Sequence, residues 1–139
     1  FKTHRIGAGR LLFEIPANQL GKDLLLVTRA AYNSRTDGLG GDEIASEVVR
    51  WERRGHRVLL RRVQFNIVAD PNNPIADAVE RSNYPAILAS FNVEAYGADS
   101  AAVIDVSRLY TSPPNEISIV QQSRGQVDAA RSFLESVAT

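Results

Sequence analysis

Short runs of alternating apolar and polar residues, each closed by glycine, proline or small polar residues, constrain the fold of this chain most strongly. The clearest run covers residues 87–96, where every second residue from Ile87 to Ala95 is apolar and the residues between them are mostly polar. An alternation with period two is typical of strands that bury one face and expose the other. The pattern therefore predicts a fold built mainly from β-strands.

Turn residues divide these runs into three predicted hairpins. Residues 4–6 and 10–15 flank a glycine turn at residues 7–9, residues 47–53 and 56–69 flank a turn at Arg54 and Gly55, and residues 87–96 and 101–106 flank a turn at residues 97–100. The arginines of the strand 56–69 are expected on its solvent side. Residues 23–31 form a more continuous apolar strand, which is expected at the centre of the sheet.

Helical signals are fewer. Asn73 is a plausible N-cap and Pro74 suits the first helical position, so a short amphipathic helix is predicted over residues 73–82. A helical turn is expected at residues 107–111 and an edge strand at residues 117–120. Asp128 is expected to cap a final helix with one apolar stripe, made of Ala130, Phe133, Leu134 and Val137.

These elements predict one α+β domain over residues 1–139, with a mainly antiparallel sheet of about six or seven strands and two or three short helices. Other all-β arrangements stay open. The chain has no methionine and opens with Phe1, Lys2 and Thr3, which suggests a fragment excised from a larger multidomain protein.

Composition narrows the possible partners. The 16 basic and 16 acidic residues cancel, so no global field attracts nucleic acid, and no nucleic-acid partner is predicted. No apolar run approaches the roughly 20 residues that a membrane-spanning helix needs, so no membrane span is predicted. Cysteine is absent, which excludes thiolate metal sites and disulfides.

No catalytic, metal or cofactor site is predicted for this chain. The two histidines, His4 and His56, have no spacing that joins them to further ligands, and an ordinary surface histidine is the favoured interpretation of each. Glu94, Asp99 and Asp105 cluster around one predicted hairpin and are the candidate acids of a hydrolase.

The expected register argues against that hydrolase. It places Glu94 opposite Val103 and Asp105 opposite Asn92, so the two carboxylates would not face each other. Solvated charges at a strand edge are the favoured interpretation of these acids.

A basic and aromatic segment is the most distinctive interaction candidate. A possible interaction surface is predicted at Arg50, Trp51, Arg53, Arg54 and Tyr96. Cross-strand ion pairs between these arginines and nearby acids are favoured over an open basic patch. Exposure of the aromatic residues on one surface would favour a recognition module; these residues are Trp51, Tyr84, Tyr96 and Tyr110.

Blocks of sequence along nearly the whole chain carry a family resemblance. They include residues 12–16 (LFEIP), 25–29 (LLVTR), 48–54 (VVRWERR), 94–97 (EAYG), 103–106 (VIDV) and 131–136 (RSFLES). The succession resembles the uncharacterised N-terminal region of a family of large bacterial zinc-dependent metalloproteases. The resemblance implies a later metzincin-like domain that bears HExxH and the zinc ligands, none of which lies within residues 1–139.

The resemblance implies a noncatalytic accessory domain that packs on or regulates a downstream catalytic domain of the same polypeptide. Its expected partners are that domain and a peptide or protein substrate; zinc belongs to the parent's catalytic domain, and the location is secreted or periplasmic. The alternative is a free-standing protein or glycan recognition module that uses the aromatic and arginine surface. A self-sufficient hydrolase is the third hypothesis.

Overall fold

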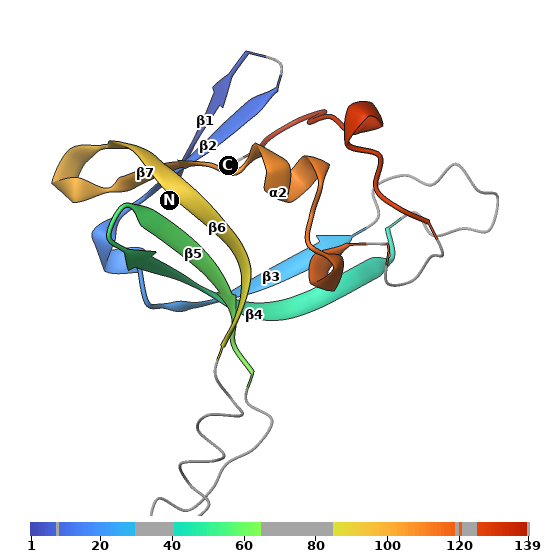
Figure 1. Cartoon of the computed structure of the whole chain (residues 1–139), viewed down its shortest axis with the longest axis horizontal. Coiled ribbons are helices and arrows are strands. Elements are labelled where there is room, and N and C mark those ends of the chain that lie inside the picture. Colours follow the sequence, from blue (N-terminus) through green and yellow to red (C-terminus); the bar gives the residue numbers. More distant parts are fainter. Residues whose placement is uncertain (8, 30–40, 65–84, 119, 121–124, 139) are drawn as a thin grey trace, which may run out of the picture.

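Seven strands form one antiparallel sheet in the computed structural model, which describes residues 1–7, 9–29, 41–64, 85–118, 120 and 125–138 (Figure 1). The order across the sheet is β1-β2-β7-β6-β5-β4-β3. The strands are β1 (Lys2–Ile6), β2 (Arg10–Ile15), β3 (Asp23–Arg29), β4 (Glu43–Arg54), β5 (Arg57–Arg62), β6 (Ala86–Tyr96) and β7 (Ala102–Asp105). The expected sheet of six or seven strands is confirmed.

Helices contribute little to the described residues. One short α-helix, α2 (Ser107–Thr111), follows β7, and 3₁₀ turns occur at η1 (Ala17–Gln19), η2 (Ala98–Ser100), η3 (Asn115–Ile117) and η5 (Ala129–Arg131). The helical turn expected at residues 107–111 is confirmed. The fold is therefore mostly β, and the helix predicted over residues 73–82 lies outside the described residues.

The three predicted hairpins form. The pair β4 and β5 is joined by a two-residue turn in which Gly55 has a φ of 60°, a left-handed conformation that glycine adopts without strain. This turn lies one residue later than the sequence predicts, because Arg54 still pairs with Arg57.

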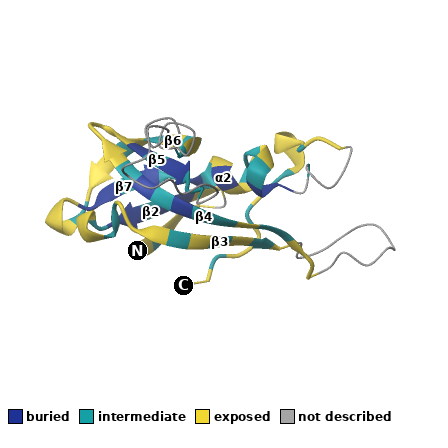
Figure 2. Cartoon of the chain, turned by 90° about the horizontal axis from the view of Figure 1, so that it is seen from below, coloured by how far each residue is buried: buried dark blue, intermediate teal, exposed yellow. Residues whose placement is uncertain are grey.

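The sheet is rolled into a half-barrel. In the sheet order β2 and β4 are separated by three strands, so in a flat sheet they would lie about 19 Å apart. The rings of Phe13 on β2 and Trp51 on β4 instead lie 6.3 Å apart between centroids. The inner face holds the core, seen as dark blue residues in Figure 2: Leu11, Ile15, Val49, Trp51, Val58, Leu60, Ala102, Ile104, Val106, Leu109 and Ile117.

The prediction that residues 23–31 form a central strand is wrong. The strand β3 lies at one edge of the sheet and pairs only with β4. Leu24 and Leu26 pack against the core, whereas Leu25 is 68% exposed and Val27 is 40% exposed. The apolar run therefore does not reflect burial on both faces.

The expected solvent position of the arginines on β5 is also partly wrong. Arg57 is exposed, but Arg61 is buried because its guanidinium donates hydrogen bonds to Glu52 (2.8 Å) and to the Pro85 carbonyl (2.7 Å). A buried guanidinium is tolerated when its donors find such partners.

Two predictions in the C-terminal part are wrong. Ile117 does not begin an edge strand; it ends η3 and inserts into the core. The Asp128 carboxylate does accept from the Ala130 amide, as a cap would, but only the single turn η5 follows. The described residues beyond η5 are not helical. The carbonyls of Leu134 and Glu135 accept hydrogen bonds from Arg5 (3.2 and 3.4 Å), whereas in a continuing helix they would accept from backbone amides of the helix itself.

Candidate functional site

The predicted arginine and aromatic surface does not form one patch. Trp51 is 5% exposed and lies in the core, packed between the rings of Phe13 and Phe91. Only Arg53 and Tyr96 come together, with the guanidinium carbon 5.3 Å from the ring centroid of a half-exposed tyrosine. Trp51 is therefore a core residue and is not part of a surface shared with the exposed arginines.

The favoured ion pairs are present. Arg50 pairs with Asp23 (2.7 Å), Arg61 with Glu52 (2.8 Å) and Arg62 with Glu47 (2.7 Å). Arg54, which is exposed like Arg53 and Arg57, lies 3.8 Å from Glu52. These acids partly neutralise the basic segment and link neighbouring strands.

The other expected aromatic residues are also dispersed. Tyr110 on α2 is half exposed and contacts Phe13 (6.3 Å), away from the Arg53 and Tyr96 pair. It borders a small apolar pocket of about 210 Å³ between β2 and β3, lined among others by Phe1, Leu24 and Trp51. Burial raises the pKa of the Tyr110 phenol. Tyr84 lies outside the described residues.

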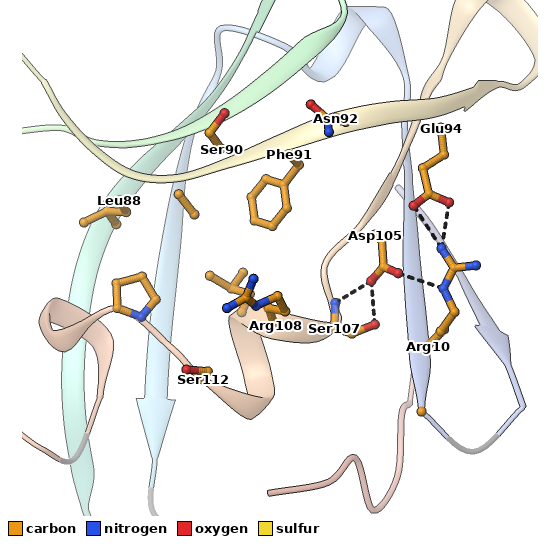
Figure 3. Close-up of a pocket in the computed structure, with 14 residues that line it drawn as sticks. Arg10, Leu88, Ser90, Phe91, Asn92, Glu94, Asp105, Ser107, Arg108 and Ser112 are labelled. Atoms are coloured by element: carbon orange, nitrogen blue, oxygen red, sulfur yellow. Dashed lines mark hydrogen bonds and ion pairs between the residues drawn. The ribbon is translucent and has the colours of Figure 1, made fainter. Parts of the chain in front are cut away.

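A larger cavity of about 650 Å³ lies between β6 and α2 (Figure 3). Its lining includes residues of β6 (Leu88, Ser90, Asn92 and Glu94) and residues of α2 and the position after it (Ser107, Arg108 and Ser112). Figure 3 shows Arg10 and Glu94 at one end of the cavity, Leu88 at the other and Arg108 between them. The lining is thus mixed, with polar groups and apolar surface side by side.

This cavity follows a strand edge that has no partner among the described strands. Along its length β6 pairs with β5 through residues 86–92, but it pairs with β7 only from Val93 onward. The chain after β7 turns away into α2 instead of continuing the ladder (Figure 3). The first half of β6 therefore has one free edge within the described structure.

The backbone groups on that edge can be identified from the ladder. The Val93 amide donates to the His56 carbonyl on the β5 side (2.9 Å). Because bonded and non-bonded pairs alternate in an antiparallel ladder, Ser90 and Asn92 occupy the non-bonded positions opposite Leu59 and Arg57. Their N–H and C=O groups point away from β5. Asn92 lies where the pairing with β7 begins, opposite Asp105, so its groups face β7, whereas those of Ser90 face the free edge.

A charged cluster closes one end of the cavity. Arg10 on β2 donates from Nε to Asp105 (2.8 Å) and from one terminal nitrogen to both oxygens of Glu94 (2.9 and 2.7 Å). The hydrogen bonds that Arg10 donates to Asp105 and Glu94 raise the pKa of Arg10. One arginine and two carboxylates leave this end with a net negative charge.

Asp105 also fixes the start of α2. Its carboxylate accepts from the backbone amide and the hydroxyl of Ser107 (2.9 and 2.5 Å). Partial burial raises the pKa of Asp105, but the hydrogen bonds from Ser107 and Arg10 outweigh it, and the pKa lies below its ordinary value. The lowered pKa keeps Asp105 ionised near neutral pH, which does not suit a general acid.

The structure corrects the expected separation of Glu94 and Asp105. Val93 pairs with Ile104 as predicted, but a bulge at Glu94 shifts the register, so that Ala95 rather than Glu94 pairs with Val103. Arg10 then brings the two carboxylates together. Asp99, the third candidate acid, lies in η2 and does not line the cavity.

Arg108 is the cation of the cavity that has no anionic partner among the residues that the structure describes. It lies in α2, is exposed, and no hydrogen bond or ion pair in the described part of the chain engages its guanidinium. Sequence reasoning missed Arg10, Ser107 and Arg108. Only Ser107 had a local signal, since an aspartate two residues before a serine is a common side-chain turn motif.

The part of the chain that the structure describes shows neither a metal-binding cluster nor a membrane-spanning helix. Within the described ranges, no group of three or more histidine or acidic side chains is placed to hold a metal ion. In the same part of the chain, no helix has the length and hydropathy that crossing a bilayer requires.

These features define a mostly β fold with an open, rolled antiparallel sheet and a polar cavity beside a free strand edge. Residues 41–139 match the model of a family described as a domain of unknown function (DUF5117), and the chain belongs to this family. No curated protein and no solved structure matches the chain.

Proposed function

We propose that this chain is a noncatalytic module that binds an extended segment of polypeptide along the free half of β6. The observation that carries the proposal is the edge itself: the N–H and C=O groups of Ser90 point away from β5, on the side of a cavity of about 650 Å³. An added strand satisfies such groups with backbone hydrogen bonds, which is the physical basis of peptide binding by β-augmentation.

The cavity is suited to the side chains of such a segment. Alternate residues of an added strand would point to opposite faces of the sheet. Those on the cavity side would meet the mixed surface between Leu88 and Ser112, and the charged end formed by Glu94 and Asp105. A glycan or nucleic acid would use the polar groups but not the ladder of backbone donors and acceptors.

We further propose that the module is an accessory domain of a zinc-dependent metallopeptidase in the same polypeptide. This part is supported by the sequence resemblance alone, which implies export of the parent protein and a zinc ion bound by a later domain. A peptide-binding module fits that context because it would hold a substrate segment near the catalytic domain and raise its effective concentration.

Proline substitution tests the binding edge. Ser90→Pro removes an N–H that the sheet does not use, so the ladder to β5 should survive, as it does for proline on edge strands. The probe is a set of ten-residue peptides selected from a randomised phage-displayed library on the wild-type chain. We expect Ser90→Pro to weaken their binding about tenfold or more, and the matched control Ser90→Ala, which keeps the N–H, to bind as the wild type does.

A second measurement covers the case in which Ser90→Pro does not fold. In the wild-type chain, saturation with a selected peptide should slow amide hydrogen exchange at Ser90. Equal binding by the proline and alanine variants, or no added protection of the Ser90 amide, would exclude strand pairing at this edge.

The accessory role has its own test. Translation of the coding DNA beyond Thr139 is expected to show HExxH with a further metal ligand. In the intact polypeptide, Ser90→Pro should then lower kcat/KM for long peptide substrates about tenfold and leave short ones unchanged. A stop codon soon after Thr139 would contradict the accessory role and leave the alternative of a free-standing binding module.

A further inference from the structure

The charge pattern of the cavity limits which polypeptide it can take. Glu94 and Asp105 are both engaged by Arg10, whereas Arg108 lies exposed on the cavity wall with no partner in the described residues. A polypeptide bound in the cavity would displace water from the Arg108 guanidinium. If the polypeptide offered no counterion, this desolvation would weaken its binding, because a charge removed from water is costly when it is unpaired.

We propose that the segment bound along β6 carries an aspartate or glutamate side chain that pairs with Arg108. This inference rests on the proposed function, since it names the chemistry of the ligand at the same site. The planar guanidinium offers five N–H donors, and two of them match the two oxygens of a carboxylate.

The position of Arg108 favours a side-chain carboxylate over the carboxylate at a chain end. Figure 3 places Arg108 between the Arg10 and Glu94 end of the cavity and the Leu88 end. A segment that follows the whole free edge therefore passes Arg108 and continues beyond it. A terminal carboxylate at Arg108 would leave one half of the cavity empty.

The net negative cluster of Arg10, Glu94 and Asp105 determines which anionic groups the bound segment can carry, and how many. A carboxylate is a monoanion that one guanidinium can neutralise, whereas a phosphate group near neutral pH is close to a dianion and would be repelled more strongly by Glu94 and Asp105. The same two acids disfavour a second acidic residue at their end of the bound segment. We therefore expect one acidic position, followed or preceded by neutral or basic residues.

Peptides selected on the wild-type chain give the test. We expect them to share one acidic position, and replacement of that glutamate by glutamine to weaken binding about tenfold at low salt, with a smaller effect at high salt. On Arg108→Gln, the glutamate and glutamine peptides should bind equally. Arg131→Gln is the matched control, because Arg131 is exposed and lies outside the cavity lining; it should preserve the preference.

Other outcomes would overturn the inference in distinct ways. Selected peptides without an acidic position, or a glutamate preference that survives in Arg108→Gln, would exclude the pairing but leave strand binding intact. Binding that requires a free C-terminal carboxylate, measured by amidating the peptide, would exclude the side-chain source. A phosphoserine peptide that binds more tightly than the glutamate peptide would exclude the monoanion preference. If no peptide binds at all, the proposed function fails together with the inference.

Discussion

Glu14 is the carboxylate that ties the N-terminal strand to the sheet. It accepts from Lys2 Nζ (3.2 Å) and is paired with the His4 ring (2.9 Å), and these hydrogen bonds lower the pKa of Glu14, with the contact to His4 contributing most. Its side chain also lies against Gly97 of the turn that joins β6 and β7. Glu14 therefore links the hairpin of β1 and β2 to the turn between β6 and β7, which is distant in the sequence.

Alanine at Gly97 should disturb this connection. A Cβ built there would lie 2.7 Å from Glu14 Oε1, so the carboxylate must move away from Lys2 or His4. We expect Gly97→Ala to lower the free energy of unfolding by about 1–2 kcal/mol in urea denaturation. Gly9→Ala, where a Cβ meets nothing within 4 Å, should change it little.

A second variant separates the clash from a backbone effect at Gly97. Adding Glu14→Ala to Gly97→Ala removes the side chain that is in the way. If the two substitutions together cost as much as the sum of each alone, the clash is not the cause of the destabilisation.

Residue-level prediction failed where contacts join distant parts of the sequence. Arg10 meets Glu94 and Asp105 over separations of 84 and 95 residues, and no spacing rule links such partners. The register expected for the last hairpin was correct at Val93 and wrong one residue later, because nothing local marks Glu94 as a bulge. Local signals did predict Asp128 as a cap and the pairing of arginines with Glu47 and Glu52.

At the scale of elements, the strands and turns of the described residues were predicted well because their signals are local. Alternation and turn residues predicted all three hairpins correctly. Both signals arise from residues that are close together in the sequence, so they can be read without knowing the rest of the fold. Two element predictions were wrong: β3 lies at the edge of the sheet, and only the single turn η5 forms where a helix was predicted. Both outcomes depend on which other elements pack against these residues, and no local signal reports that. The stripe that suggested a helix contains Phe133, which is 79% exposed, and Leu134 and Val137, which pack on the core without helical structure.

The helix α2 depends on one side chain for its place in the molecule. Leu109 is 7% exposed and belongs to the core, while its neighbours Arg108 and Tyr110 are exposed. We expect Leu109→Ala to lower the free energy of unfolding by about 2–4 kcal/mol, measured by urea denaturation. Leu25→Ala, at a leucine that is 68% exposed, is the matched control and should cost less than about 1 kcal/mol; equal losses would contradict the anchoring role of Leu109.

At the scale of the whole molecule, a line of aromatic rings crosses the inside of the half-barrel. Phe1, Phe13, Trp51 and Phe91 are in successive contact, with centroid distances of 6.3, 6.3 and 5.7 Å. These rings connect β2 to β4 across the concave side, where the sheet itself provides no hydrogen bonds between the two strands. The same ring contacts thus stabilise the rolled shape of the sheet and form part of its hydrophobic core.

Trp51 makes this feature measurable, because it is the single tryptophan of the chain. We expect its fluorescence to be that of a buried indole and to shift to longer wavelength on unfolding, in a transition that coincides with the loss of the far-UV circular dichroism signal. A fluorescence transition at clearly lower denaturant concentration would show that the sheet unrolls before its strands separate.

The pairing of β2 with β7 also determines when the cavity can form during folding. The strands β3, β4, β5 and β6 are consecutive in both sequence and sheet, whereas β2 must pair with β7, which follows it in the sequence only after those four strands. Non-local pairings carry the largest entropy cost and are slow to form. We therefore expect the hairpin of β1 and β2 to dock last, so that a nascent or partly folded chain lacks the Arg10 end of the cavity beside β6 until the fold is complete.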